Sequence, residues 1–295
     1  VSSLHGSWLG ERDGLLEASM AKEAAVWANV NDIAIRFTAE RYAKFENIAI
    51  RESSICVANS RATRADFESR YNPPPNWDCE VVHWGVDTEM FRPLDIENEQ
   101  ENRNFTEIRT RFGAVSPGSK LLLAVGRLAA RKGYGTLIRG FSALNKEMPN
   151  TKLVIVGRGH LKRRLMRLAK SLGVGEDVTI ESSLSFAELA QLYRSSDLVV
   201  YPSFYEGQGL IPLEAMASGV PVVTVDHGPL PEMVDESVGA LFTMGNIESM
   251  VSVMKEVLKA GRKKGEKGRA RVLQKFTYSG NAESFENIYL EAINR

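Results

Sequence analysis

The chain has 295 residues, 43% of them hydrophobic and 25% charged, which is the composition of an ordinary soluble globular protein with room for two domains. Lysine and arginine together number 37, as do aspartate and glutamate, so net charge gives no argument for a nucleic-acid partner. The two cysteines, Cys56 and Cys79, argue against a disulfide framework and fit a reducing cytosol, so we expect a cytoplasmic protein. No apolar run approaches the roughly 20 residues that span a bilayer.

The first 90 residues are expected to hold part of an N-terminal Rossmann-like domain. The chain starts at Val1 without an initiator methionine or the basic segment of a signal peptide, so it reads as a chain entered partway through a domain. The residue pattern predicts strands ending at Leu4 and spanning 54–58 and 79–83, and helices over 15–30, 33–51 and 59–71.

A polar, acidic stretch covers residues 91–107, with Pro93 near its start. This composition is typical of a linker between domains. We therefore predict a linker at 91–118, which separates the partial domain at 1–90 from a second domain at 119–278.

From Lys120 onward, short apolar runs alternate with amphipathic segments, and this α/β pattern predicts a parallel sheet with helices on both faces. The last segment, 279–295, is expected to form a helix that crosses back toward the N-terminal domain. The expected strands are 121–125, 152–156, 178–181, 198–201, 222–225 and 238–242, and the main helices are 136–146, a basic helix ending at 172, 186–195 and 247–259.

The most informative stretch follows the fourth strand of that sheet. Glu206 precedes a Gly-x-Gly turn at Gly207 and Gly209, and Glu214 lies in the first turn of a short helix that is expected to start near Pro212. Each feature has an ordinary explanation, because a glutamate in a first turn favours the helix dipole and glycines permit tight turns. Together they favour a polar ligand site at the carboxyl edge of a parallel sheet.

Cationic side chains follow the first strand of the second domain. Arg127, in the loop after Gly126, and Lys132 lie where fixed cations suit a diphosphate, although a solvated basic loop explains them equally well. Arg131 is expected to face solvent. His5 follows strand-like residues and is either a crevice residue or a histidine on the surface.

Other patterns carry less information. Glu206 and Glu214 would suit the acid and nucleophile of a glycosidase, but their spacing gives no carboxylate separation. The run Gly157-Arg158-Gly159 lacks the rest of a dinucleotide fingerprint, and the four scattered histidines predict no metal site. The basic run at 259–271 is most simply a solvated helix face, with peripheral contact at the inner face of a membrane as the minority interpretation.

Several motifs, in order, resemble retaining glycosyltransferases of the GT-B fold, specifically glycosyltransferase family 4 of the glycosyl transferases group 1. Residues 206–223 read E-G-Q-G-L-I-P-L-E-A-M-A-S-G-V-P-V-V, in which two glutamates are spaced as E-x7-E. V-G-R-L with K-G lies at 125–133, V-G-R-G at 156–159 and G-V-D at 85–87. The resemblance covers residues 121 to about 293 and implies two Rossmann-like domains with parallel sheets.

The resemblance implies metal-independent transfer from a UDP-, GDP- or ADP-sugar, with no cofactor and with retention of anomeric configuration. It implies that Arg127 and Lys132 are catalytic cations for the diphosphate, and that His5 and Glu206 lie at the transferred sugar. Glu214 would bind the ribose. The donor-binding residues that the resemblance implies are Gly126, Arg127, Lys132, Ser183, Leu184, Gly207, Gln208, Gly209, Leu210, Ile211 and Glu214.

Two residues depart from the family pattern: Gln208 stands where an aromatic residue is usual, which bears on donor preference, and Trp84 stands where asparagine is common. The family's N-terminal domain has a glycine-rich loop and several strands before the position of His5, so this domain is expected to be truncated. The acceptor stays open among a glycan, a lipid and a small molecule. Two alternatives remain open, namely a non-catalytic donor-binding subunit completed by a partner chain, and a sugar phosphorylase or epimerase of the same fold.

Overall fold

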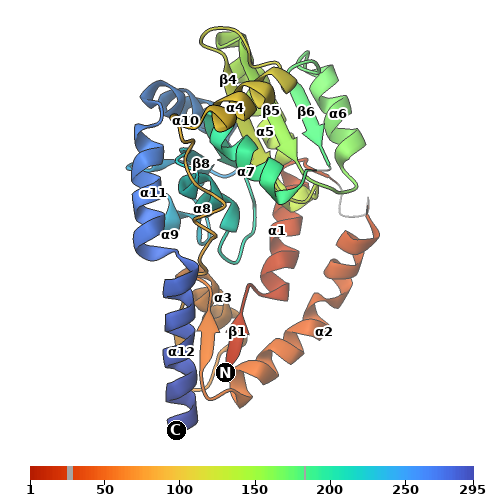
Figure 1. The fold of residues 1–295 in the computed structure, drawn as a ribbon. Helices are drawn as coiled ribbons and strands as arrows, with labels where there is room; N and C mark the ends of the chain where they lie inside the picture. The colour runs from red at the N-terminus through yellow and green to blue at the C-terminus, as the bar shows by residue number, and fades with distance from the viewer. Residues whose placement is uncertain (25–28, 183) are drawn as a thin grey trace.

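The computed structural model describes residues 1–24, 29–182 and 184–295, which form a three-stranded and a six-stranded parallel sheet, each covered by helices (Figure 1). The small sheet has the order β1-β2-β3, and the large sheet has the order β6-β5-β4-β7-β8-β9. This architecture agrees with the α/β class expected from the sequence. We call the part built on the small sheet the small-sheet unit and the part built on the large sheet the large-sheet unit.

The small-sheet unit is formed by the first part of the chain. Its strands all run parallel because helices connect them, as in other βαβ arrangements. Its elements are β1 (Ser2–Leu4), α1 (Trp8–Met20), α2 (Val30–Glu52), β2 (Cys56–Ala58), α3 (Arg61–Tyr71) and β3 (Cys79–Val81).

Helix α1 begins before the start that the sequence predicts. Ser7 caps it, because its Oγ accepts the backbone N–H of Gly10 at 2.9 Å, and the helix therefore starts at Trp8. Helix α1 ends at Met20, so the expected helix at 15–30 is wrong over its middle; its part at 25–28 lies outside the described residues.

The large-sheet unit alternates strands and helices, and its central strands are apolar and buried apart from Lys120 at the start of one of them, as in parallel sheets that are covered on both faces. Strand β7 lies inside the sheet and β9 at its edge, as the sequence predicts. The elements are β4 (Lys120–Val125), η2 (Ala130–Lys132), α5 (Tyr134–Glu147), β5 (Thr151–Val156), α6 (Lys162–Ser171), β6 (Val178–Glu181), α7 (Phe186–Ser195), β7 (Leu198–Tyr201), α8 (Leu210–Ala217), β8 (Val222–Val225), α9 (Leu230–Met233), β9 (Gly239–Phe242), α10 (Ile247–Ala260) and α11 (Lys263–Lys275). The last helix, α12 (Tyr278–Asn294), packs on the small sheet instead.

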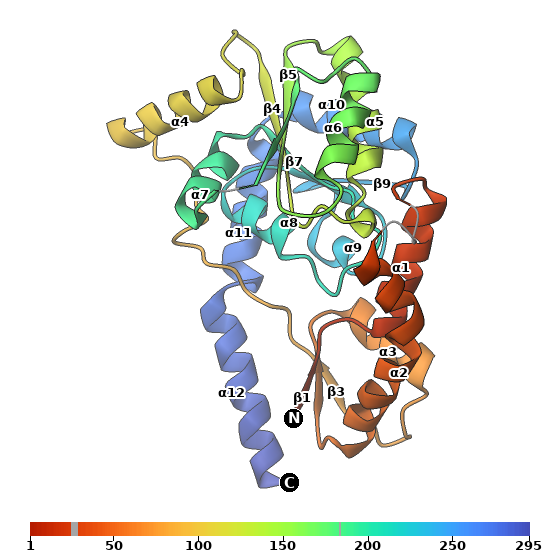
Figure 2. The same cartoon turned by 90° about the vertical axis from the view of Figure 1, so that its right-hand side faces the viewer.

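The stretch that the sequence presents as a polar linker contains a helix, α4 (Glu99–Arg111), which lies beside α7 (Figure 2). Asn98 caps this helix by accepting the backbone N–H groups of Gln100 and Glu101. Arg109 then donates to Asp197 at 2.9 Å, which fixes the helix to the large-sheet unit. A cap and an ion pair add to the packing of Ile108 on the core, and because Phe105 and Ile108 are the only large apolar residues of this helix, its hydrophobic pattern does not reveal it. The division into 1–90, 91–118, 119–278 and 279–295 stays a prediction.

The basic run at 259–271 is only in part the solvated helix face that the sequence predicts: Lys259, Lys263 and Lys267 are exposed, but the other cations are bound to the protein. Arg269 Nη1 donates to three backbone carbonyl groups, those of Thr88, Phe91 and Ala217, at 3.0, 2.9 and 3.1 Å. The other cations of the run that donate to backbone carbonyl groups are Arg262, Lys264 and Arg271. These side chains hold segments of the chain together because they satisfy carbonyl groups at the ends of other elements.

Helix α12 runs along the small sheet (Figure 1) and buries Ile288 in a cluster with Ile55, Val57 and Val82. The chain therefore returns to the small-sheet unit at its C-terminal end. Among the helices of the described ranges, none has the length and apolar content needed to cross a bilayer.

Each unit also caps a helix of the other. Glu23, after α1, accepts the backbone N–H groups of Gly135 and Thr136 at 2.7 and 2.5 Å, at the start of α5. Glu232, in α9, accepts those of Arg61 and Ala62 at 2.9 and 2.8 Å, at the start of α3. These reciprocal caps fix the two units across the crevice that separates them.

Candidate functional site in the crevice

Lys132 and Glu206 form a buried ion pair near the carboxyl ends of β4 and β7. Glu206 Oε1 also accepts the hydroxyl groups of Tyr201 and Ser203, at 2.7 and 2.5 Å, and Lys132 Nζ lies 3.0 Å from the Tyr201 hydroxyl. Burial acts to raise the pKa of Glu206, but Lys132 and the neighbouring Arg131 hold it below its ordinary value. The carboxylate is therefore ionised and held in one position.

The loop after Glu206 is gripped by the small-sheet unit. The carbonyl oxygen of Gly207 accepts the hydroxyl groups of Ser60 and Thr63, at 2.6 and 2.9 Å. A Cβ atom at this position would collide with the backbone carbonyl group of His5, so only glycine fits. The glycine thus lets two backbone segments from different units lie against each other.

Helix α8 begins at Leu210, two residues before the expected start at Pro212, because Gly209 turns the chain with a φ of +97°. Leu210 and Ile211 lie in its first turn. Glu214 is further along the helix, where its Oε2 accepts the hydroxyl group of Tyr193 at 2.7 Å. Burial raises the pKa of Glu214 to about 7.

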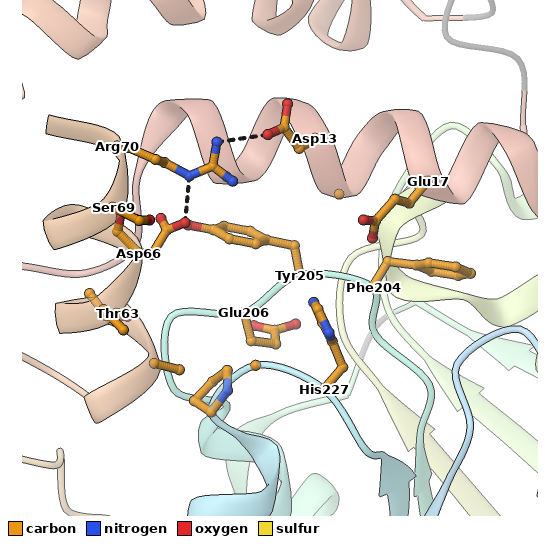
Figure 3. A pocket seen from close by; sticks show the side chains of 16 residues that line it. Asp13, Glu17, Thr63, Asp66, Ser69, Arg70, Phe204, Tyr205, Glu206 and His227 are labelled. Atoms are coloured by element: carbon orange, nitrogen blue, oxygen red, sulfur yellow. Dashed lines mark hydrogen bonds and ion pairs between the residues drawn. The ribbon is translucent and has the colours of Figure 1, made fainter.

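Three cavities lie along the crevice. The first cavity, of about 460 Å³, lies between α1 and α3 and is lined by Asp13, Asp66 and Tyr205 among others (Figure 3). Arg70 reaches across it from α3, with Nη1 2.7 Å from Asp13 and Nε 2.5 Å from Asp66. This ion-pair cluster joins the two helices of the small-sheet unit.

The second cavity, of about 350 Å³, is lined by three residues that the sequence singles out, namely His5, Glu206 and Gly207. The imidazole ring of His5 packs against the indole of Trp84, with ring centroids 4.6 Å apart. The structure therefore brings the loop histidine and the first glutamate of the E-x7-E motif to one cavity, although they are far apart in the chain.

The third cavity, of about 220 Å³, lies on the other side of α1 and is lined by Arg127, Arg158, His160 and Asp32. Arg127 is exposed, and its side chain makes no hydrogen bond or ion pair with the part of the chain that the structure describes, so its guanidinium group is available to a ligand. Gly126, just before it, has a φ of +141°, and a Cβ there would lie 2.8 Å from the Tyr134 hydroxyl.

The remaining residues of the expected site lie elsewhere. Glu214 does not line these three cavities, and Gln208 is buried with its amide bound to the backbone of Trp84. Leu184 is partly buried against the main core. Ser183 falls outside the described residues. Among the residues that the structure does describe, no group of three or more His, Cys, Asp or Glu side chains could hold a metal ion.

Sequence reasoning missed Tyr205, whose side chain lies on α1 between the first and second cavities. Cβ atoms at Gly6, Gly10 and Gly14 would all contact it, and its hydroxyl donates to the Ser7 carbonyl at 3.1 Å. The glycine repeat at every fourth residue is the signal that could have revealed a groove on this helix.

Arg131 does not face solvent as expected. Only 15% of its side chain is exposed, and its Nε lies 3.1 Å from Glu11 Oε1 on α1. Its Nη1 also donates to the carbonyl oxygen of Tyr205 at 3.4 Å. The expectation fails because α1 covers η2, and this contact between distant segments has no local sequence signal.

Comparison with known proteins identifies the fold and the family. Residues 106–271 match the family model for glycosyl transferases group 1. The chain is 30% identical over 255 residues to D-inositol 3-phosphate glycosyltransferase of Segniliparus rotundus, an alignment that covers 84% of this chain and 54% of that protein. It is 31% identical over 227 residues to the GDP-mannose-dependent alpha-(1-6)-phosphatidylinositol monomannoside mannosyltransferase of Mycolicibacterium smegmatis, covering 74% and 56%.

Among solved structures, Anabaena HepE in complex with UDP and glucose has a TM-score of 0.74 to this chain at 21% identity, over 86% of this chain and 67% of that one. Likeness of this kind confirms the GT-B type of α/β fold. The chain spans about half the length of the curated relatives it matches. On the family match, which includes both β4 with its cationic loop and the E-x7-E motif, the chain belongs to the glycosyl transferases group 1 family.

Proposed function

We propose that the protein is a glycosyltransferase that moves a sugar from a nucleotide-diphosphate sugar to an acceptor, with retention of anomeric configuration and without a metal ion. The observation that carries the proposal is the buried Lys132–Glu206 pair, which lies beside a cavity that His5 also lines. An ionised carboxylate at a cavity suits the hydroxyl groups of a sugar, and the adjacent cation suits a phosphate.

The proposed reaction breaks the bond between the anomeric carbon and the diphosphate, and the electron pair of that bond goes to the leaving diphosphate. Lys132 and Arg127 would stabilise the negative charge as it develops, which is the role that a metal ion has in other enzymes. For retention, the acceptor hydroxyl must approach on the face from which the diphosphate leaves, and its proton passes to the departing phosphate oxygen. Glu206 would bind sugar hydroxyl groups throughout.

The names of the relatives support a nucleotide-sugar donor. One relative is called GDP-mannose-dependent, and HepE was solved with UDP and glucose bound. These names leave the nucleotide open between UDP and GDP, and the acceptor open among a glycan, a lipid and a small molecule. Family members bind the donor largely with the part of the chain that matches here. We therefore propose that Glu214 binds the ribose and that the backbone of 207–211 and of 183–184 binds the rest of the donor. Gly126 would let the diphosphate approach the backbone closely.

Donor hydrolysis tests the proposal without knowledge of the acceptor, because water replaces the acceptor at a slow rate. UDP-, GDP- and ADP-sugars would be incubated with the protein in the presence of EDTA, and released nucleoside diphosphate would be measured. We expect Lys132→Met and Glu206→Gln to lower the rate at least a hundredfold, as for the loss of a charge-stabilising group. Lys146→Met and Glu147→Gln, at two exposed positions of α5, are the matched control substitutions and should leave the rate unchanged.

Wild-type rates in both site variants would contradict the residue assignment. Release of nucleoside diphosphate by the isolated chain would reject the alternative of a non-catalytic subunit that needs a partner. With an acceptor in hand, the anomeric configuration of the product, read by NMR, tests retention directly.

A further inference from the structure

The ion pair between Glu11 and Arg131 forms the boundary between the second and third cavities, since both residues line both cavities. Glu11 lies on α1 of the small-sheet unit and Arg131 lies on η2 of the large-sheet unit. Their side chains remain 25% and 15% exposed, so the pair is accessible from the crevice.

The two cavities contain the two halves of the proposed donor site. His5 and Glu206, proposed for the transferred sugar, line the second cavity, whereas Arg127, proposed for the diphosphate, lines the third. The sugar and the diphosphate of a donor are joined by one covalent bond. A donor that contacts both sets of residues must therefore pass between them, where Glu11 and Arg131 now meet.

The charges at this boundary respond to a diphosphate in opposite ways. The guanidinium group of Arg131 attracts phosphate oxygens and can bind two of them, whereas the carboxylate of Glu11 repels them. Arg131 is also close enough to Glu206 and Lys132 to affect both electrostatically. A phosphate at the boundary would therefore lie near three cations, namely Arg127, Arg131 and Lys132.

The backbone of Arg131 is bound within the large-sheet unit, whereas its side chain is bound by residues that face the crevice. Its carbonyl oxygen accepts the backbone N–H of Phe204 at 2.7 Å and the hydroxyl of Ser203 at 3.2 Å. The guanidinium group, in contrast, is held by one carboxylate and one long hydrogen bond to Tyr205. Exchange of the Glu11 carboxylate for a phosphate thus requires only a change of side-chain rotamer.

We propose that Arg131 is a further donor-binding residue, and that the carboxylate of Glu11 occupies it until the diphosphate of the donor takes its place. The inference rests on the proposed function, because it assumes that a nucleotide-diphosphate sugar spans the two cavities. Glu11 then lowers the apparent donor affinity by the fraction of molecules in which Arg131 is already paired.

The two partners of this pair should respond in opposite directions when they are changed. Binding of UDP and GDP to the purified protein would be measured by isothermal titration calorimetry. Glu11→Gln should tighten binding several-fold, because it removes both the competitor and a repelling charge. Arg131→Gln should weaken binding roughly tenfold or more, as for the loss of a charge-assisted hydrogen bond.

The double variant makes the test independent of small changes in folding. In the Arg131→Gln background, Glu11→Gln should tighten binding clearly less than it does in the wild-type protein, because it then removes only the repelling charge and no competitor for a guanidinium group. A pair that only joined the two units would behave differently, since each single change would lower the melting temperature and weaken binding alike. Weaker or unchanged binding in Glu11→Gln would overturn the inference, as would unchanged binding in Arg131→Gln.

The exposed ion pair between Arg64 and Glu68 on α3 supplies the matched control, and Arg64→Gln and Glu68→Gln should leave binding unchanged. Failure of the inference is separable from failure of the proposed function. If the wild-type protein binds neither UDP nor GDP, or if Lys132→Met binds them equally well, the donor site itself is wrong. If the wild-type protein binds a nucleotide and Lys132→Met weakens that binding, but Glu11→Gln and Arg131→Gln do not change the affinity in opposite directions, only the assignment of Arg131 and Glu11 is wrong.

Discussion

The side-chain amide of Gln208 binds both backbone groups of Trp84: its Oε1 accepts the N–H at 2.7 Å, and its Nε2 donates to the carbonyl oxygen at 3.0 Å. These are the two positions at which the sequence departs from the family pattern, and they meet across the crevice. The indole of Trp84 in turn packs on His5. The two departures therefore form one contact that positions a wall of the second cavity.

Replacement of Gln208 by alanine should destabilise the protein by roughly 1–3 kcal/mol, because it leaves two partly buried backbone groups of Trp84 without the amide that binds them. The free energy of unfolding in urea measures the effect. Gln274→Ala, on the exposed face of α11, is the control and should change it by less than about 0.5 kcal/mol. Equal stability of the two variants would show that water replaces the lost amide.

Glu232 should make stability depend on pH in the acid range. Burial acts to raise its pKa, but the hydrogen bonds from His83 and from the backbone of Arg61 and Ala62 hold the pKa of Glu232 below its ordinary value of 4.5. A depressed pKa stabilises the folded state above about pH 4.5, and this contribution is lost as the pH falls through the lower, folded-state pKa.

Glu232→Gln should therefore cost about 1–3 kcal/mol at pH 7, and the difference from wild type should shrink below pH 4.5. Urea unfolding at a series of pH values provides the measurement, with the exposed Glu286→Gln on α12 as the control. A difference that is the same at pH 7 and at pH 3 would mean that the charge of Glu232 is not what stabilises the cap.

Glu214 should have the opposite effect on the pH dependence of stability. Burial raises its pKa to about 7, so the folded state binds a proton that the unfolded state releases near pH 4.5. Stability should therefore fall as the pH rises from about 4.5 to about 7 and stay level above that. Glu214→Gln keeps an acceptor for the Tyr193 hydroxyl and should be more stable than wild type at pH 8, by roughly 3 kcal/mol at most. Denaturation at pH 5 and pH 8 measures this, and a wild-type protein that gains stability over this range would refute it.

Gly10→Ala should destabilise the protein by about 1–3 kcal/mol, although alanine is the better helix former. The new Cβ would lie 2.5 Å from Cε2 of Tyr205 and 2.7 Å from its hydroxyl oxygen. Gly280→Ala in α12, where the nearest atom is 3.3 Å away, is the control. The cost should largely disappear in a Tyr205→Leu background, as thermal unfolding of the double variant can show; a cost that persists there would place the conflict elsewhere.

Most of the large sheet is predictable because its central strands, such as β7 and β8, are short apolar runs that are buried on both faces. Local residue type alone decides such elements. The polar stretch at 91–107 does not predict helix α4 because the helix has only two large apolar residues, Phe105 and Ile108, and its cap at Asn98 and its ion pair to Asp197 depend on the folded chain. Arg269 was misjudged for a similar reason, since the carbonyl groups that it binds belong to residues distant in the chain.

The sequence by itself determined the family, the α/β class and the residue types of the site, because the E-x7-E motif and the cationic loop are each contiguous in the chain. Only the tertiary structure decided which side chains meet. It pairs Lys132 with Glu206, Gln208 with Trp84 and Arg131 with Glu11. The physical reason is that an ion pair or a buried hydrogen bond needs a partner within about 3 Å, and the packing of α1 and the small sheet on the large-sheet unit determines which partner comes that close.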